Sequence, residues 1–318
     1  MEYRRLGRAG VKVSPLALGT WLNFGRTIDG DAAARHVRMA LDRGINFIDT
    51  ADVYGLGAAE TTLGLALDGI PRKDYVLATK CYFPTGDGPN DRGLSRKHIF
   101  ESCHASLSRL RTDCIDLYQC HRFDEETPVE ETVRAMGDLL SQGKIHYWGV
   151  SMWTATQIEE GVAVANAMGA PTPVTNQPCY NLLDREIEAE ILPACEKFGM
   201  GTLPYSPLDQ GMLTGKYAGG QTGNGSRAAT PQWKAMMGRY FADDAQARVD
   251  RYLAVAKETA FSPAQLALAW LLHRRGVTSL LVGARTTEQL EENLAVLDIA
   301  WDPELDKALD SIFPANAN

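Results

Sequence analysis

Four residue types in this 318-residue chain could together move a proton onto an oxygen atom: Asp49, Tyr54, Lys80 and His121. A tyrosine hydroxyl, with a pKa of about 10, is a poor acid at neutral pH, but a nearby lysine ammonium favours the phenolate and lowers that pKa. An aspartate would keep the lysine charged and oriented. A histidine could donate a hydrogen bond to a carbonyl oxygen. These groups could therefore protonate the oxygen of a carbonyl while it is reduced.

Such a reduction needs a nicotinamide or flavin cofactor, because no amino-acid side chain donates hydride. A lysine at the end of a strand also permits Schiff-base chemistry, so a lyase that uses Lys80 is an alternative. Each residue has a structural explanation as well: a helix cap for Asp49, a loop aromatic for Tyr54, a solvated strand end for Lys80 and a core position for His121. The sequence holds no HExxH motif and no GxSxG elbow, and we expect no metal site.

The elements that must position these residues follow from an alternation of short apolar runs with amphipathic stretches of helical length. Strands that alternate with helices indicate a parallel sheet, and eight such units without a linker favour a closed (β/α)8 TIM barrel over a doubly wound sheet. Residues 3–6 and 11–14 flank a turn and predict an N-terminal β-hairpin. The predicted barrel strands are residues 16–19, 46–51, 76–80, 115–121, 145–151, 174–177, 201–205 and 278–283.

The C-terminal ends of barrel strands are where function gathers in such a fold, and the four candidate residues follow the second, third and fourth strands. A capping-box pattern, which predicts the start of a helix, begins at each of four residues: Thr127, Thr154, Ser262 and Thr286. Residues 209–260 form a long insertion after the seventh strand, glycine-rich at first and helical around residues 243–258. Insertions at this face usually serve the active site. We expect one barrel domain over residues 1–318.

Composition indicates a folded soluble protein, with 45% hydrophobic and 23% charged residues. The net charge of −8 argues against a nucleic-acid binder, which needs a basic surface. Six cysteines without a CxxC pair predict free thiols. The sequence shows no signal peptide and no run of about 18–20 apolar residues, so we expect a cytoplasmic protein without membrane insertion. The oligomeric state stays open, a homo-oligomer included.

The whole chain, from about residue 3 to 293, resembles the aldo-keto reductases, and most closely the branch of the potassium-channel β-subunits and their bacterial relatives. The resemblance rests on residues 44–55 (GINFIDTADVYG), 78–80 (ATK), 116–121 (DLYQCH), 149–151 (GVS), 204–208 (PYSPL) and 282–285 (VGAR). Residues 92–98 (RGLSRKH) and 131–136 (ETVRAM) carry the similarity to that branch.

The resemblance implies that Asp49, Tyr54, Lys80 and His121 are the family's catalytic tetrad. Tyr54 would be the general acid, Lys80 held by Asp49 would tune it, and His121 would orient the substrate carbonyl. The expected reaction is the reversible reduction of an aldehyde or ketone to an alcohol. The channel β-subunits carry asparagine where this chain has His121, which favours a working enzyme. A cofactor-sensing accessory subunit of a membrane protein, with little turnover, is the alternative.

The same resemblance implies a site for NADPH or NADP+, with NADH as the alternative. Ser151 and Gln177 would bind the nicotinamide carboxamide, and Tyr205 would stack on its ring. The pyrophosphate would lie along the segment after the seventh strand, and the adenosine phosphate between residues 283 and 293. The implied cofactor residues are Thr20, Trp21, Asp49, Ser151, Gln177, Tyr205, Ser206, Pro207, Leu208, Gly211, Leu213, Lys216, Gly283, Arg285, Gln289, Glu292 and Asn293.

Two positions depart from the family's usual pattern. Met152 stands where many members have asparagine, and Gly283-Ala284 stands where many have Lys-Ser, so Arg285 would have to supply positive charge. Residues 55–60 (GLGAAE) are close to a dinucleotide-binding fingerprint but lack its last glycine, which indicates a tight turn beside Tyr54.

Aromatic residues just beyond the strand ends predict a pocket for apolar or ring-containing carbonyl compounds. Packing beneath loops is the alternative for several of them. The predicted pocket residues are Trp21, Tyr54, Tyr82, Phe83, His121, Phe123 and Trp153.

Overall fold

The computed structural model describes residues 1–220 and 243–315 and shows a parallel sheet curled into a barrel. Its eight strands are hydrogen-bonded in the order β10-β3-β4-β5-β6-β7-β8-β9. The last strand returns to the first, because the N–H of Thr278 donates to the carbonyl of Thr202 at 2.9 Å. The predicted (β/α)8 fold is therefore confirmed. The strands are β3 (Leu16–Gly19), β4 (Phe47–Asp49), β5 (Val76–Cys81), β6 (Ile115–Cys120), β7 (Ile145–Ser151), β8 (Thr175–Gln177), β9 (Gly201–Thr202) and β10 (Leu280–Val282).

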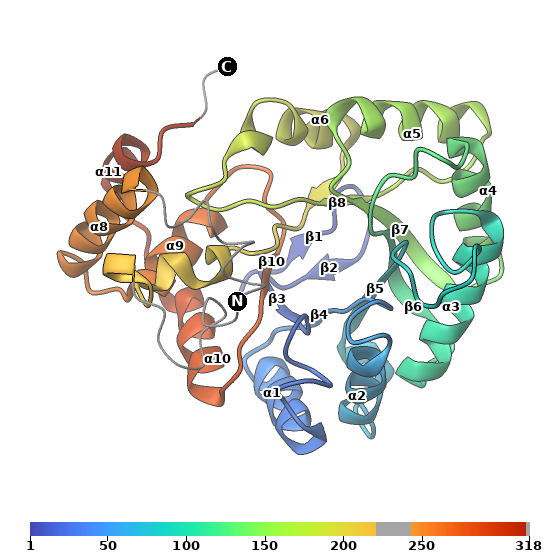
Figure 1. Cartoon of the computed structure of the whole chain (residues 1–318), viewed down its shortest axis with the longest axis horizontal. Coiled ribbons are helices and arrows are strands. Elements are labelled where there is room, and N and C mark those ends of the chain that lie inside the picture. Colours follow the sequence, from blue (N-terminus) through green and yellow to red (C-terminus); the bar gives the residue numbers. More distant parts are fainter. Residues whose placement is uncertain (221–242, 316–318) are drawn as a thin grey trace.

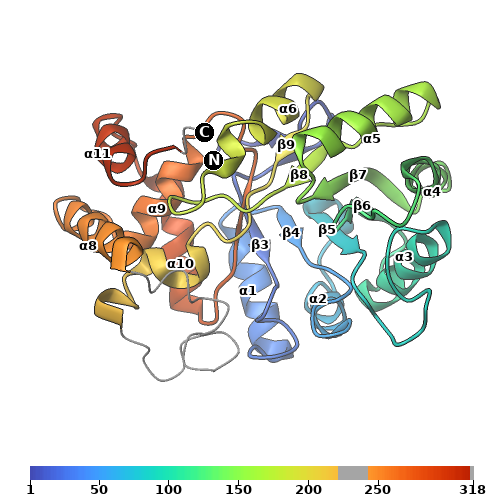
Figure 2. The ribbon, with the colours of Figure 1, turned by 45° about the horizontal axis from the view of Figure 1, so that its top comes forward.

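Helices surround this sheet (Figures 1 and 2). The first six cover the barrel in chain order, and α8, α9, α10 and α11 lie together on one side of it (Figure 1). They are α1 (Gly30–Asp42), α2 (Ala58–Ala66), α3 (Arg96–Leu110), α4 (Val129–Ser141), α5 (Ala155–Ala167), α6 (Ile191–Phe198), α8 (Asp243–Lys257), α9 (Pro263–Leu272), α10 (Thr287–Leu294) and α11 (Glu304–Ile312). Short 3-10 helices are η1 (Arg72–Asp74), η2 (Glu186–Glu188), η3 (Asp209–Thr214), η4 (Ala218–Gly220) and η7 (Ala295–Asp298).

The predicted hairpin closes one end of the barrel. Strands β1 (Arg4–Arg5) and β2 (Lys12–Val13) pair antiparallel. Leu6 and Val13 of this hairpin join a buried apolar cluster inside the barrel with residues such as Phe47 and Leu117. With one end filled by apolar side chains, only the C-terminal ends of the strands remain open to a ligand.

Three of the four predicted helix caps are present. Thr154 and Ser262 form complete capping boxes with Gln157 and Gln265. The hydroxyl of Thr286 accepts a bond from the N–H of Gln289. The prediction for Thr127 is wrong: α4 has no side-chain cap, and the Thr127 hydroxyl donates instead to Asp124 at 2.7 Å.

The insertion after β9 contributes η3, η4 and the predicted helix, which is α8. Most of its glycine-rich part, from residue 221 on, lies outside the described residues. All six cysteines are free, and four of them are buried. No helix in the described part of the chain is long and apolar enough to cross a membrane.

Candidate active site

The alternation of side chains along the parallel strands places three polar residues inside the open end of the barrel. Phe47, Ala78 and Leu117 point into the interior cluster, so Asp49, Lys80 and Gln119, each two residues further along the strand, point inward as well. All three are buried, and Lys80 is 0% exposed. Pairing of β5 with β6 sets Lys80 beside Gln119 in register. The sheet alone therefore brings these groups together.

Lys80 is the centre of a buried charge pair. Its Nζ donates to Oδ1 of Asp49 at 2.5 Å and to the carbonyl of Thr50 at 2.7 Å. It also lies 3.5 Å from the hydroxyl oxygen of Tyr54. Burial lowers the pKa of Lys80, but attraction to Asp49 and Tyr54 outweighs it, and the pKa is raised. Lys80 is thus a fixed ammonium, as expected from the sequence.

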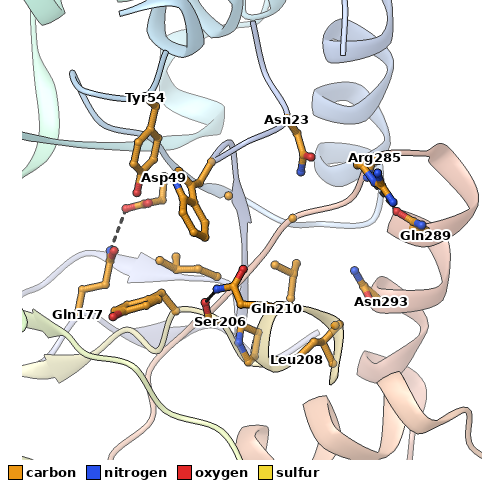
Figure 3. Close-up of a pocket in the computed structure, with 18 of the residues that line it drawn as sticks. Asn23, Asp49, Tyr54, Gln177, Ser206, Leu208, Gln210, Arg285, Gln289 and Asn293 are labelled. Atoms are coloured by element: carbon orange, nitrogen blue, oxygen red, sulfur yellow. Dashed lines mark hydrogen bonds between the residues drawn. The ribbon is translucent and has the colours of Figure 1, made fainter. Parts of the chain in front are cut away.

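The second carboxylate oxygen of Asp49 is held by amides. Oδ2 accepts from Nε2 of Gln177 at 3.0 Å, the contact drawn in Figure 3, and from Nε2 of Gln119 at 3.3 Å. A carboxylate with a charged partner and two amide donors is satisfied despite its burial. Asp49 therefore orients Lys80 and, through Gln177, the wall of the site.

Tyr54 lies between this charge pair and the open space of the barrel. Its pKa is raised, because burial of the phenolate outweighs the lowering by the Lys80 ammonium and its hydrogen bond. The sequence predicted the lysine contribution correctly and missed the larger effect of burial. The hydroxyl accordingly keeps its proton at neutral pH and can donate it.

His121 packs edge-on against Tyr54, with ring centroids 5.8 Å apart. Burial first, and then the charges of Lys80 and Arg122, hold the pKa of this imidazole well below its usual range. The ring is therefore neutral and carries a proton on one nitrogen only. Its buried Nδ1 has no hydrogen-bond partner among the described residues. A neutral imidazole beside the Tyr54 hydroxyl can help to hold a carbonyl oxygen.

A cavity of about 760 Å³ begins at these residues and runs beyond the barrel rim. In Figure 3, Tyr54, Asp49 and Gln177 lie on one side of it, and Arg285, Gln289 and Asn293 on the other. Ser206, Leu208 and Gln210 lie between the two groups. We call the first side the reactive end and the second the helix end. Predicted residues that line the cavity are Trp21, Asp49, Tyr54, Phe83, His121, Ser151, Gln177, Tyr205, Ser206, Pro207, Leu208, Gly211, Lys216, Gly283, Arg285, Gln289, Glu292 and Asn293.

Next to the reactive end, the neighbouring strands β7 and β8 end in polar residues that lie side by side. Ser151 pairs in register with Gln177, and its hydroxyl donates to the Gln177 carbonyl at 2.8 Å. Met152 follows with φ of 58°, an unusual conformation for a residue with a side chain. Its sulfur lies 3.3 Å from the hydroxyl oxygen of Tyr205. The aromatic predicted to stack on a ring is therefore held beside the strand ends.

The segment after β9 bends sharply along the cavity. Ser206, Asp209 and Gln210 all have positive φ, and the Gln210 amide donates to the Ser206 hydroxyl at 2.7 Å. At Gly211, with φ of 98°, a Cβ atom would lie 2.3 Å from Nζ of Lys216. The positive φ favours glycine at this position, and the absence of a Cβ leaves room for the end of the lysine side chain beside the backbone. The arrangement presents an ammonium group at the cavity wall.

At the helix end, the start of α10 forms the wall. The backbone N–H of Arg285 donates to the side-chain oxygen of Gln289 at 3.0 Å. Arg285 and Gln289 are exposed, whereas Asn293 is 4% exposed. A cation and a helix N-terminus attract anions, and a buried amide suits a polar ring edge. The chemistry of this wall fits a phosphorylated nucleoside.

Several predicted residues lie outside the cavity lining. The hydroxyl of the buried Thr20 donates to Thr50 at 2.8 Å. Leu213 is fully buried, and Lys80 lies behind Tyr54. Trp153 is 1% exposed and packs edge-on against Phe123, and Tyr82 packs against Phe83, so the alternative of packing under loops holds for these three. The GLGAAE run makes the predicted tight turn, with φ of 61° at Gly55 and 88° at Gly57.

Other lining residues were not singled out from the sequence. Arg122 directly follows a predicted tetrad residue, and Gln210 lies within the predicted pyrophosphate segment, so proximity could have pointed to both. Asn23 becomes part of the wall only because its loop folds back, which places its Nδ2 3.2 Å from the site of a Cβ on Gly283. The additional lining residues are Gly19, Asn23, Val53, Arg122, Gln210, Thr214, Ala264, Leu281 and Val282.

Comparison with known proteins agrees with this geometry. The sequence model of the aldo/keto reductase family matches residues 15–313. The chain belongs to this family. As an aldo/keto reductase it is an oxidoreductase, and members of the family generally use NAD(P)H.

Among the curated proteins, this aldo/keto reductase is similar to three proteins named as potassium channel subunits. It is 43% identical to a probable voltage-gated potassium channel subunit beta of Oryza sativa subsp. japonica, over 94% of this chain and 92% of that protein. A protein of the same name from Arabidopsis thaliana is 41% identical, with the same coverage. A putative subunit beta of Schizosaccharomyces pombe is 38% identical, over 98% of this chain and 93% of that protein.

Proposed function

We propose that this protein reduces an aldehyde or ketone to an alcohol with NADPH, reversibly, and that Tyr54 is the general acid. The observation that carries the proposal is the contact of the Tyr54 hydroxyl with Lys80 at the mouth of the cavity, 3.5 Å apart. Lys80 is itself fixed by Asp49. A protonated phenol beside a permanent ammonium can release its proton to a developing alkoxide, because the ammonium stabilises the phenolate that remains.

The neutral imidazole of His121 complements this proton donor. It cannot repel a substrate by charge, and its N–H can hold the carbonyl oxygen near the Tyr54 hydroxyl. In the direction of alcohol oxidation, Tyr54 must instead accept a proton. The raised pKa of Tyr54 makes that direction faster at alkaline pH.

The residues along the cavity fit a nicotinamide dinucleotide. Ser151 and Gln177 offer amide and hydroxyl groups, Tyr205 an aromatic face, and Lys216 and Arg285 positive charge, all within one cavity. This cofactor supplies the hydride when it is bound. Arg285, next to the start of α10, supports a preference for the additional phosphate of NADPH over NADH.

The names of the relatives favour a second candidate, a cofactor-sensing accessory subunit with little turnover. The two candidates differ in turnover and not in cofactor binding. A Schiff-base lyase is not favoured, because Lys80 is a buried ammonium paired with Asp49 and has no neutral amine to offer.

The test is NADPH oxidation with a panel of aldehydes and ketones, by the wild type and by Tyr54→Phe. We expect steady turnover by the wild type and a loss in kcat of about 100- to 10,000-fold in the variant. Cofactor binding, followed by fluorescence quenching, should stay unchanged.

Full activity of Tyr54→Phe would contradict the role of Tyr54. Tight cofactor binding with negligible turnover of every carbonyl compound would favour the accessory subunit.

A further inference from the structure

Arg122 brings a charge to the reactive end that the proposed chemistry does not use. It follows β6, is half-buried and lines the cavity. Its Nη1 donates to the carbonyl of His121 at 2.5 Å, and its guanidinium carbon lies 5.1 Å from the centroid of the Phe83 ring. Phe83 also packs edge-on against the imidazole of His121, with centroids 4.8 Å apart. One aromatic ring therefore supports both the guanidinium and the histidine.

The charge of Arg122 has no acidic partner among the described residues. Two of its acidic neighbours in sequence are engaged elsewhere: Asp124 accepts from the N–H of Leu94 and the hydroxyl of Thr127, and Glu126 faces Arg92. The third, Glu125, is exposed. The partly buried Arg4 donates to two backbone carbonyls, but other arginines at comparable depth have carboxylate partners. These are Arg72 with Asp116, Arg109 with Glu60, and Arg185 with Glu188 and Asp310. Arg122 is thus left with most of its five N–H donors available.

The unpaired charge acts on the space where a substrate must bind. Burial raises the pKa values of Tyr54 and Tyr205 and lowers that of His121, and the charge of Arg122 opposes the first effect and adds to the second. All three groups line the cavity. Two acids are among the described lining residues, Asp49 and Glu292. Asp49 is neutralised by Lys80, and Glu292 lies at the helix end with Arg285. The reactive end is therefore positive although the chain as a whole is acidic.

We propose that Arg122 selects carbonyl substrates that carry an anionic group, a carboxylate or a phosphate monoester, a few bonds from the carbonyl. The inference rests on the proposed reduction and names its substrate class. A guanidinium presents paired donors that match two oxygens of such a group. Because Phe83 supports both Arg122 and His121, the anionic group and the carbonyl must be joined by a short linker. This departs from the apolar, aromatic substrate expected from the sequence.

The experiment compares two matched pairs of aldehydes with NADPH: 4-oxobutanoate with its methyl ester, and glyceraldehyde 3-phosphate with glyceraldehyde. The wild type should prefer the charged member of at least one pair, and the pair identifies the anion. Arg122→Gln should lower kcat/KM for that member by about 10- to 100-fold, mainly through KM, the range expected for losing charge-assisted hydrogen bonds. For the neutral member the change should stay below about threefold, and Arg122→Lys should retain part of the preference.

Arg96→Gln is a matched control, because Arg96 also lies over a phenylalanine ring, Phe100 at 4.5 Å, but is not among the cavity-lining residues. It should leave both pairs unchanged. If Arg122→Gln does not fold, inhibition of the wild type decides: succinate should compete with the carbonyl substrate more strongly than succinamide. Turnover of neutral aldehydes without a preference that depends on Arg122, or equal inhibition by both compounds, overturns this inference alone. No turnover of any of the four aldehydes overturns this inference, and no turnover of the wider panel of aldehydes and ketones overturns the proposed function as well.

Discussion

The two ends of the cavity handle charge in different ways. At the reactive end the charges of Lys80 and Asp49 are buried on adjacent strands and paired at 2.5 Å. At the helix end Lys216 and Arg285 are exposed and come from a loop and from the start of a helix. Buried charges interact strongly and are hardly screened by salt, whereas exposed charges are screened within about 8 Å at physiological ionic strength.

This difference suggests that the reactive end determines the rate of the chemical step and the helix end determines the affinity for the cofactor. Parallel strands fix the reactive end to within the precision that proton transfer needs, and its charged pair, Asp49 and Lys80, is already hydrogen-bonded within the protein. The helix end presents exposed charged groups that come from a loop and from the start of a helix. Changes at the first end should therefore affect kcat and folding stability, and changes at the second should affect binding and its dependence on salt.

Lys80→Met provides the strongest test of the buried pair. It leaves the Asp49 carboxylate buried without its cation, and we expect a loss in the free energy of unfolding of about 3–5 kcal/mol. Turnover should fall as well, because the phenolate of Tyr54 loses its stabilising charge. Urea denaturation and single-turnover kinetics measure the two effects.

The double variant Lys80→Met/Asp49→Asn controls for the loss of the pair. It removes both charges and should recover much of the stability but none of the activity. If Lys80→Met alone were as stable as the wild type, the stability of the folded protein would not depend on the pairing of Lys80 with Asp49.

At the helix end, Arg285→Gln and Lys216→Gln should each weaken NADPH binding by about 10-fold at low salt, with a smaller effect in 0.5 M salt, because exposed charges are screened. For Arg285→Gln the affinity for NADH should change less. The turnover number at saturating cofactor should stay within about twofold of the wild type. Dissociation constants from fluorescence titration at two ionic strengths give the result.

Arg275→Gln removes one positive charge at an exposed residue that is not among those lining the cavity. It should leave the NADPH affinity unchanged. If it weakens binding as much as Arg285→Gln does, the effect comes from net charge and not from a contact at α10.

The sequence predicted the fold well because buried parallel strands read as short apolar runs. Its errors are local. The strand predicted over residues 201–205 is only Gly201–Thr202. Thr127 does not cap its helix, because Asp124 takes its hydroxyl. Such competition between neighbouring side chains depends on how the loop folds, and periodicity carries no information on it.

The direction of a side chain could be predicted from the sequence for residues within strands, but not for residues just beyond them. Alternation fixes the direction of Asp49 and Lys80. After β7, however, the positive φ of Met152 turns the chain, and Trp153 packs into the core and not into the pocket. Arg122 is a related case: it has no acidic partner among the residues that the structure describes, and only the tertiary structure shows that.

Asp52 is buried close to Lys80 and Asp49, but unlike them it has no charged partner at hydrogen-bond distance among the described residues. It is 1% exposed, and no side-chain hydrogen bond reaches either of its carboxylate oxygens in the described part of the chain. Burial first, and then the charge of Glu60, raise its pKa to about 8, and the backbone N–H of Val53 and the charges of Arg109 and Lys80 offset only part of this. The group is therefore neutral in the folded protein at pH 7, whereas it is ionised in the unfolded chain.

The consequence is a loss of stability with rising pH. Because the folded state binds the additional proton, the contribution of Asp52 to stability is complete below pH 4 and is lost as the pH rises through about 8. Asp52→Asn removes this dependence, so its Tm should exceed that of the wild type by about 2–4 °C at pH 8.5, with a smaller difference at pH 5. Asp68→Asn changes an exposed aspartate and should show no such trend. A constant or reversed difference across this range would mean that Asp52 is ionised in the folded protein and that the reactive end tolerates an unpaired charge after all.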